Sequence, residues 1–256
     1  MTLAELLDIE KTVGDRTGWD FSAMETETDP TPWDYVDLVR RYLKSTDFVL
    51  DIGTGGGERF LELASSYGKG IGIDSDPEMI KTANQKVNVE QKTKITFKVM
   101  DAANLTFADA TFDVVIDRQG PIPVKQIVRI LKPGGYFITQ MIGKNNMVNI
   151  NQEFDSQEFS KNQLEGEADL IAQEFANLGC SVVSICSYDV GYYVKDVASL
   201  LFWFKAIRSR GHAASTIPED FCVEKYYKQI NNLITKYQTD RGIRTNEHRE
   251  LLVIKK

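Results

Sequence analysis

Residues 48–60 read F-V-L-D-I-G-T-G-G-G-E-R-F: an apolar run, a cluster of glycines, and a return to helix-forming residues. The apolar run predicts a short buried strand, Phe48–Ile52. The glycines that follow can adopt the positive φ angles of a tight turn, and they leave bare backbone for a ligand to approach. Residues that favour a helix begin at Glu58. A strand, a glycine turn and the start of a helix together indicate the nucleotide-binding corner of an α/β fold.

The spacing of the glycines discriminates between nucleotides. The dinucleotide fingerprint G-x-G-x-x-G needs a third small residue where this chain has Glu58, and an acid in the first helical turn faces a pyrophosphate badly. No Gly-Lys-Ser/Thr sequence follows the glycines, which argues against a phosphate-binding loop. The pattern D-x-G-x-G-x-G does fit, with Asp51 ahead of Gly53, Gly55 and Gly57. In this motif the chain resembles the class I S-adenosylmethionine-dependent methyltransferases.

The next predicted strand, Lys69–Asp74, also ends in an acid. Asp74 follows the glycines by about 20 residues, where nucleotide-binding folds carry the carboxylate that accepts the ribose hydroxyls. Capping of the helix that begins with Asp76 is the alternative role for Asp74. We assign Asp74 and the adjacent Ser75 to the cofactor.

A third predicted strand, Ile95–Met100, precedes Asp101 and Ala102. The resemblance implies that this pair binds adenine, with the Asp101 carboxylate accepting the exocyclic amine and the Ala102 amide donating to a ring nitrogen. From the residues alone, a turn is an equal interpretation of Asp101.

The fourth predicted strand, Phe112–Ile116, leads into D-R-Q-G-P on the carboxyl edge of the sheet, where open α/β folds bind ligands. Asp117 is expected to anchor the cofactor's amino group, although its position also suits a base. Arg118 is a candidate for binding an anionic substrate or the methionine carboxylate, with a salt bridge as the equal alternative. No catalytic residue is assigned.

The resemblance, which is clearest from Phe48 to Leu178, implies a doubly wound, seven-stranded, mostly parallel sheet with helices on both faces. Its last two strands would be Ser181–Tyr188 and an antiparallel Arg249–Lys255. We predict an N-terminal helical cover (1–47), a cofactor-binding core (48–188 and 247–256) and a helical lid inserted before the last strand (189–246). A second helix near Trp33–Leu43 would begin with Thr31 as its cap, and Asn145–Lys161 reads as a loop.

The predicted lid holds an apolar helix, Val197–Arg208, and an amphipathic one, Phe221–Tyr237. Such aromatic density is more often core than ligand site. An apolar pair inserted late in the sheet must nevertheless pack on something, and the open carboxyl edge is an available surface. We therefore predict a lid in which Trp203 contacts the substrate.

Composition limits the partners. Residues 200–256 hold 11 Lys/Arg against 6 Asp/Glu, a net of +5, so the formal charge of −7 leaves −12 on the first 199 residues. This balance argues against nucleic acid. Neither a leader nor an 18-residue apolar run is present, which predicts a soluble, cytoplasmic protein without a membrane partner. Three cysteines without C-x-x-C support neither disulfides nor a metal site.

The sequence thus predicts methyl transfer from S-adenosylmethionine to a small-molecule acceptor of unknown identity, with the oligomeric state left open. One alternative is an rRNA guanine methyltransferase. The D-R-Q-G-P segment and the late aromatic insert resemble the catalytic module of bacterial 23S rRNA guanine-N1 methyltransferases, although no cysteines precede Cys180 to form their zinc module. A non-catalytic S-adenosylmethionine-binding protein is a further alternative, and a nicotinamide oxidoreductase is a more distant one.

Overall fold

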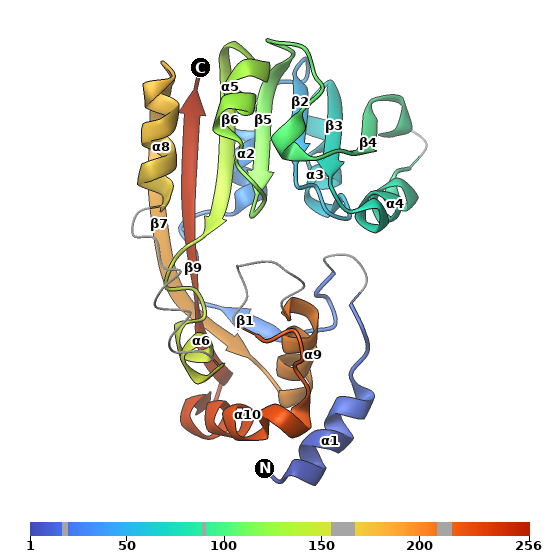
Figure 1. Cartoon of the computed structure of the whole chain (residues 1–256), viewed down its shortest axis with the longest axis vertical. Coiled ribbons are helices and arrows are strands. Elements are labelled where there is room, and N and C mark those ends of the chain that lie inside the picture. The colour runs from blue at the N-terminus through green and yellow to red at the C-terminus, as the bar shows by residue number, and fades with distance from the viewer. Residues whose placement is uncertain (17–19, 89–90, 155–166, 209–216) are drawn as a thin grey trace. The chain divides into compact units, whose positions relative to one another are not determined.

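The computed structural model describes residues 1–16, 20–88, 91–154, 167–208 and 217–256 (Figure 1). The chain divides into two compact units. The core unit comprises Pro32–Gly143, Gly166–Ser187 and Arg249–Lys256, and the helical unit comprises Met1–Thr31, Lys144–Glu165 and Tyr188–His248.

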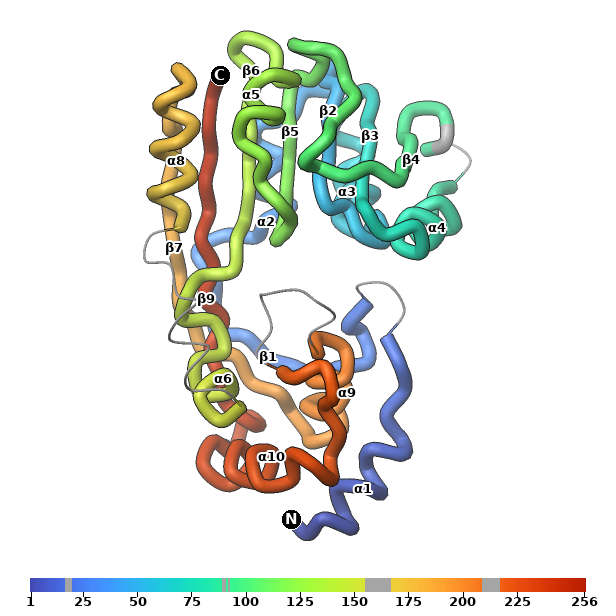
Figure 2. Tube along the Cα trace, in the orientation of Figure 1, coloured from blue at the N-terminus to red at the C-terminus, as the bar shows by residue number. Residues whose placement is uncertain are grey.

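Within the core unit, five strands run parallel in the order β6-β5-β2-β3-β4, as Figure 2 traces. β9 joins β6 in the antiparallel sense, and β7 follows β9. The sheet is therefore mostly parallel, as predicted. The strands are β2 (Phe48–Ile52), β3 (Lys69–Asp74), β4 (Ile95–Val99), β5 (Phe112–Arg118), β6 (Leu131–Ile142), β7 (Ser181–Val194) and β9 (Gly242–Lys255).

Helices cover both faces of this sheet because successive strand residues point to opposite sides. In β2, for example, Leu50 joins one buried apolar cluster and Val49 the other. The first cluster includes residues of α5 (Val124–Ile130) and α8 (Glu167–Asn177). The second includes residues of α2 (Tyr35–Arg40), α3 (Glu58–Glu62) and α4 (Pro77–Lys86). The doubly wound α/β architecture is thus confirmed. Short 3₁₀ turns lie at Ala64–Ser66, Gln91–Thr93 and Ala102–Asn104.

The described sheet has nine strands rather than seven. The two additions are β1 (Thr26–Thr28), which pairs with β7, and β8 (Gln238–Thr239), which pairs with β9. β7 extends to Val194 and β9 begins at Gly242, so both are longer than predicted. The extensions escaped prediction because their partner strands are only two or three residues long and carry no apolar alternation of their own.

The helical unit has its own core. Its helices are α1 (Leu3–Thr12), α6 (Val148–Phe154), α9 (Val197–Ile207) and α10 (Val223–Tyr237). All four contribute buried side chains to one apolar cluster, among them Leu6, Ile150, Phe204 and Leu233. The apolar residues of the inserted helices therefore pack largely with one another. In the described part of the chain, no helix combines the length and hydropathy that crossing a bilayer requires.

Two local predictions were wrong. The second helix begins after Asp34, whose carboxylate accepts from the Asp37 amide at 2.9 Å, and not after Thr31. Residues 145–154 are not a simple loop, because Val148–Phe154 form α6, where Ile150 is buried. The remainder of that predicted loop, 155–161, lies outside the described residues.

The unit boundaries also differ from those of the three predicted segments, since Pro32–Asp47 belong to the core unit and Lys144–Glu165 to the helical unit. The roles of cover and lid stay predictions.

Candidate functional site

Four adjacent parallel strands bring acidic residues to one edge of the core sheet. Asp117 of β5 lies beside Ile52, so it neighbours Asp51 of β2. Asp51 pairs with Gly72 of β3, and Asp74 at the end of β3 pairs with Val99 of β4, two residues before Asp101. Because the strands are parallel, all four acids lie at their carboxyl ends, where open α/β folds bind ligands.

The glycine turn after β2 needs its glycines. Gly53, Gly55 and Gly57 have φ angles of 66°, 56° and 77°, which side chains other than hydrogen rarely allow. A Cβ on Gly57 would also lie 2.8 Å from the Phe97 ring, so this position excludes any side chain without rearrangement. The Gly55 amide donates to Asp74 Oδ2 at 2.9 Å, which ties the turn to β3.

Asp74 is a turn-fixing residue and not the cap of α4. Its Oδ1 accepts from the Asp76 amide at 2.9 Å, while Asp76 itself caps α4 by accepting from the Glu78 amide at 2.8 Å. The structure thus excludes the cap as the role of Asp74 and leaves the ribose role as a prediction. The neighbouring Ser75 is exposed.

Asp101 occupies the turn after β4. Its two oxygens accept from the Ala103 amide and the Asn104 side-chain amide, each at 2.9 Å, and Ala102 is buried. The turn interpretation of Asp101 is therefore observed. A turn held in this way also fixes the Ala102 amide, which the resemblance assigns to adenine, and that assignment stays a prediction.

Asp51 and Asp117 are the buried members of the set, with exposed fractions of 7% and 0%. Burial, with smaller contributions from the carboxylates of Asp117 and Asp74, raises the pKa of Asp51 to about 8. The Thr54 hydroxyl and the charge of Arg118 act in the opposite direction. Burial likewise raises the pKa of Asp117 to about 7. Two buried acids that resist ionisation favour a cationic ligand beside them, because a positive charge offsets the cost of burying each carboxylate.

One oxygen of Asp117 is fully paired and the other is not. Oδ1 accepts from the Thr139 hydroxyl at 2.9 Å and from the Gly120 amide at 3.3 Å. Oδ2 is buried without a hydrogen-bond partner among the described residues, close to the glycine turn. A buried oxygen without a donor is costly, and such atoms are commonly found at functional sites. The half-buried Arg118 follows directly in the chain.

Several residues that hold the β5 exit carry no recognisable sequence signal. The Tyr35 hydroxyl donates to the Asp117 carbonyl at 3.0 Å, and the Trp33 indole donates to Gln140 Oε1 at 2.9 Å. Gln119 has a φ of 62°, which is strained for a residue with a side chain. Finding Tyr35 and Trp33 required knowledge of where α2 packs. An aromatic residue at the start of a short helix, with another two positions before it, does not give that knowledge.

Trp203 belongs to the helical unit, where its ring centroid lies 5.5 Å from that of Tyr192. It is partly buried beside the apolar cluster of that unit. The structure accounts for its apolar surroundings in this way, and its contact with a substrate stays a prediction.

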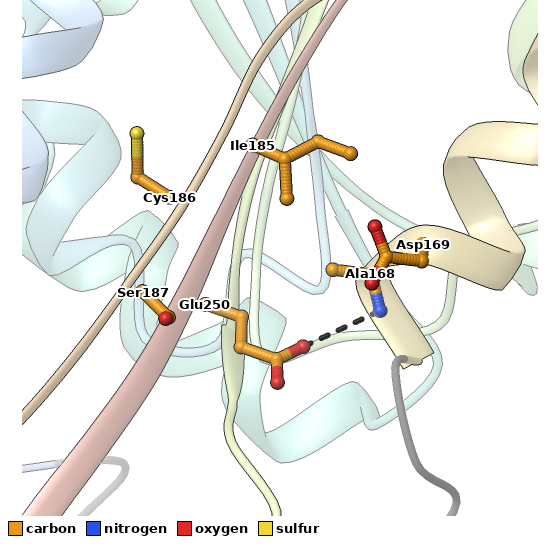
Figure 3. A pocket seen from close by; sticks show the side chains of 6 residues that line it. All are labelled: Ala168, Asp169, Ile185, Cys186, Ser187 and Glu250. Carbon is orange, nitrogen blue, oxygen red and sulfur yellow. Dashed lines mark hydrogen bonds between the residues drawn. The ribbon is translucent and has the colours of Figure 1, made fainter.

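A shallow pocket of about 130 Å³ lies elsewhere in the core unit (Figure 3). It is lined by α8, β7 and β9, and the Glu250 carboxylate at its wall accepts from the Ala168 amide at 3.3 Å. β9 and β6 separate β7 from β5 in the sheet. The pocket therefore contains none of the predicted site residues, and we do not assign it to the cofactor.

A doubly wound sheet with a glycine turn and acids at four strand ends defines a nucleotide-binding α/β domain. Residues 49–135 match the sequence model of a family described as a methyltransferase domain. This segment is accordingly a methyltransferase domain of the class I, S-adenosylmethionine-dependent family, and S-adenosylmethionine is its cofactor.

Similar proteins agree with this assignment. Over 104 residues the chain is 34% identical to a demethylmenaquinone methyltransferase from Lactobacillus johnsonii, covering 36% of this chain and 43% of that protein. The fold resembles a putative methyltransferase from Bacillus halodurans (TM-score 0.60, 17% identity, 87% and 98% of the two chains). It also resembles Haemonchus contortus phosphoethanolamine N-methyltransferase 2, solved with phosphomonomethylethanolamine and S-adenosylhomocysteine (TM-score 0.52, 20% identity, 86% and 52%).

The chain spans between 27% and 48% of the length of eight curated relatives that it matches. The named acceptors among these proteins are small molecules, such as quinones and phosphoethanolamine. The narrower resemblance to rRNA guanine methyltransferases is not borne out.

Proposed function

We propose that the protein transfers a methyl group from S-adenosylmethionine to a small-molecule acceptor by in-line displacement. The observation that carries this proposal is the glycine turn together with Asp51, Asp74, Asp101 and Asp117 at one edge of the matched methyltransferase domain. The named small-molecule acceptors of its relatives support the class of acceptor.

The residues at this edge fit the chemical groups of the cofactor. The backbone of the turn from Gly53 to Gly57 would contact the methionine end, Asp74 with Ser75 would take the ribose hydroxyls, and Asp101 with Ala102 would take the adenine. The two buried acids, Asp51 and Asp117, would face the positively charged end, which is the charge they favour.

The cofactor supplies an electrophilic methyl group on a sulfonium that loses its charge as the group leaves. The contribution of the protein is then mainly positional, because alignment of two reactants in a dry site can supply a large part of the rate enhancement. Asp51 and Asp117 are buried at the strand ends. The Tyr35 hydroxyl donates to the Asp117 carbonyl at the β5 exit, and the Trp33 indole donates to Gln140 of the neighbouring β6. Arg118 would bind an anionic group of the acceptor.

RNA is the second candidate acceptor, and the charge distribution disfavours it. The segment with a net positive charge, residues 200–256, has 11 Lys/Arg against 6 Asp/Glu, whereas the rest of the chain is at −12. A polyanion needs a dense basic surface.

The small-molecule proposal has two further parts: the protein is located in the cytoplasm, and Trp203 contacts the acceptor.

The experiment is a methyl-transfer screen with tritiated S-adenosylmethionine against three acceptor pools: reduced quinones, phosphorylated amines, and ribosomal RNA. We expect label in one of the two small-molecule pools and none in RNA. The Asp74→Ala variant serves as a background control for contaminating enzymes. Label in RNA alone would replace the small-molecule proposal, and cofactor binding without transfer to any pool would favour the non-catalytic alternative.

A further inference from the structure

The segment Ser181–Ser187 of β7 lies at an edge of the core sheet. On one side β7 neighbours β9. On the other side its partner is β1, which pairs only with Tyr192–Val194. Among the described residues, the backbone of Ser181–Ser187 therefore has no strand partner on that side. Edge strands of this kind are the usual places where a sheet adds a strand from another chain.

This edge lacks the features that normally block pairing. The segment reads S-V-V-S-I-C-S, without a charge, a proline or a glycine. Its apolar side chains are solvent-exposed, with Val182 at 41%, Val183 at 46% and Ile185 at 41%. They lie on both faces of the strand, and Figure 3 shows Ile185 directed toward α8 and Cys186 directed to the opposite side. Leu170 of α8 and Leu178, directly after that helix, are also exposed, at 54% and 42%.

The order of residues identifies the partner. Read in either direction, S-V-V-S-I-C-S gives serine, two apolar residues, serine, two apolar residues, serine. An antiparallel pair of two such strands with a two-fold axis at Ser184 places Val183 opposite the partner's Ile185 and Val182 opposite the partner's Cys186. Each apolar residue meets an apolar residue, and each serine meets a serine. A second copy of this chain always carries the same palindromic pattern, so it is the partner that this self-complementary strand fits.

Charge supports the same conclusion. The chain carries a net charge of −7, so two copies repel each other over most of their surfaces. A seven-residue segment without charge is a place where this repulsion is low. We propose that the protein forms a two-fold symmetric dimer through antiparallel pairing of Ser181–Ser187, which joins two core sheets into one. This association is independent of the methyl-transfer proposal.

The first test compares two edge strands of the same sheet. Val183→Lys puts a charge on the proposed edge, and Val99→Lys puts the same charge on β4, the opposite edge, where Val99 is 53% exposed. Sedimentation velocity over a range of concentrations should give wild type twice the 28.9 kDa chain mass at the upper end. We expect Val183→Lys to raise the dissociation constant at least about tenfold and Val99→Lys to leave it unchanged. A monomeric wild type, or equal dimerisation by Val183→Lys, would overturn the proposal.

The second test fixes the register and does not depend on the stability of a lysine variant. In a Cys222→Ser background, Val182→Cys should form a disulfide with the partner's Cys186 under mild oxidation, because opposite residues in an antiparallel pair lie about 5 Å apart. Val183→Cys, opposite Ile185, should not. The parent, which keeps the exposed Cys186 and the buried Cys180, should also fail to cross-link, since the two Cys186 residues would be roughly 13 Å apart. Efficient cross-linking through Cys186 alone, or no cross-link in the Val182→Cys variant, would contradict this pairing.

Discussion

The core unit takes five of its strands from one unbroken stretch, Pro32–Gly143, whereas the helical unit gathers three separated stretches around a single apolar cluster. In the helical unit, the Tyr227 hydroxyl donates to the carbonyl of Met1 at 2.9 Å, across almost the whole chain. The core unit thus follows from repeated local signals, each a strand, a turn and a helix. The helical unit depends on contacts between distant residues, which local patterns do not reveal.

The two units also treat charge differently. The core unit buries Asp51 and Asp117 at strand ends, at the cost of raised pKa values. In the helical unit, the guanidinium of Arg241 contacts Glu27 at 2.6 Å and Asp29 at 2.8 Å, in a partly exposed network. Buried acids that resist ionisation suit ligand binding, while paired exposed charges suit a structural surface. This contrast favours the core unit as the place of the chemistry.

The largest expected effect tests whether the two apolar cores are separate. Phe204 is fully buried in the helical unit, and Phe137 is fully buried in the core unit, where it stacks on Phe175 at 5.2 Å. Replacing either by alanine should cost about 3–5 kcal/mol. Hydrogen exchange measured by mass spectrometry should show faster exchange in α9 and α10 for Phe204→Ala, and in β5 and β6 for Phe137→Ala. Faster exchange throughout both units in each variant would remove the distinction between them.

A smaller effect concerns pH. The folded-state pKa of Asp117 lies at about 7, above its unfolded value of about 3.9, because the fold disfavours the carboxylate. The folded state therefore binds the Asp117 proton more tightly than the unfolded state does. The stability that this proton contributes is complete below about pH 4 and is lost as the pH rises through about 7. One pKa unit corresponds to about 1.4 kcal/mol, so the loss between about pH 5 and about pH 8 is on the order of 3 kcal/mol. Urea unfolding at these two pH values should show at least this fall in wild type, because buried Asp51, with a pKa of about 8, also loses its proton in this range. The fall should be smaller in Asp117→Asn. Identical falls in both proteins would mean that Asp117 is not the titrating group.

The third prediction compares Asp74, which we assign to ligand binding, with Asp76, which caps α4 two positions later. Asp74→Ala should weaken S-adenosylhomocysteine binding by about 1.5–3 kcal/mol, because a charged partner of the ribose hydroxyls is lost. Asp76→Ala is the matched control. It removes the cap of α4 and should cost about 1 kcal/mol of stability with little change in affinity. Calorimetric titration of both variants distinguishes the roles, and equal affinities for the two would refute the ribose assignment.

Prediction from sequence succeeded for features that depend on neighbouring residues alone, such as short apolar strands and glycine turns. The strands Phe48–Ile52 and Lys69–Asp74 have the predicted bounds, and the glycines at 53, 55 and 57 do take positive φ angles. Prediction failed at Thr31, where two plausible caps lay three residues apart and the chain uses Asp34. It also missed β1, because three residues of T-E-T give no alternation that marks a strand.

The candidate site shows the same division. Acids at strand ends could be found by their position after an apolar run, but their surroundings could not. The Thr139 hydroxyl that pairs with Asp117 lies on the neighbouring strand, 22 residues away, and Tyr35 reaches the same residue from α2. Such partners are defined only once the strand order and the packing of α2 are known.

The central claim is that the core unit binds S-adenosylmethionine and not a dinucleotide. The most direct measurement is the unfolding free energy with each ligand added separately. At a hundredfold excess over its dissociation constant, S-adenosylhomocysteine should stabilise the protein by about 2.7 kcal/mol, since a ligand that binds only the folded state shifts the equilibrium by mass action. NAD should have no effect, because Glu58 stands where a dinucleotide fold needs a small residue. Stabilisation by NAD with none by S-adenosylhomocysteine would contradict this claim.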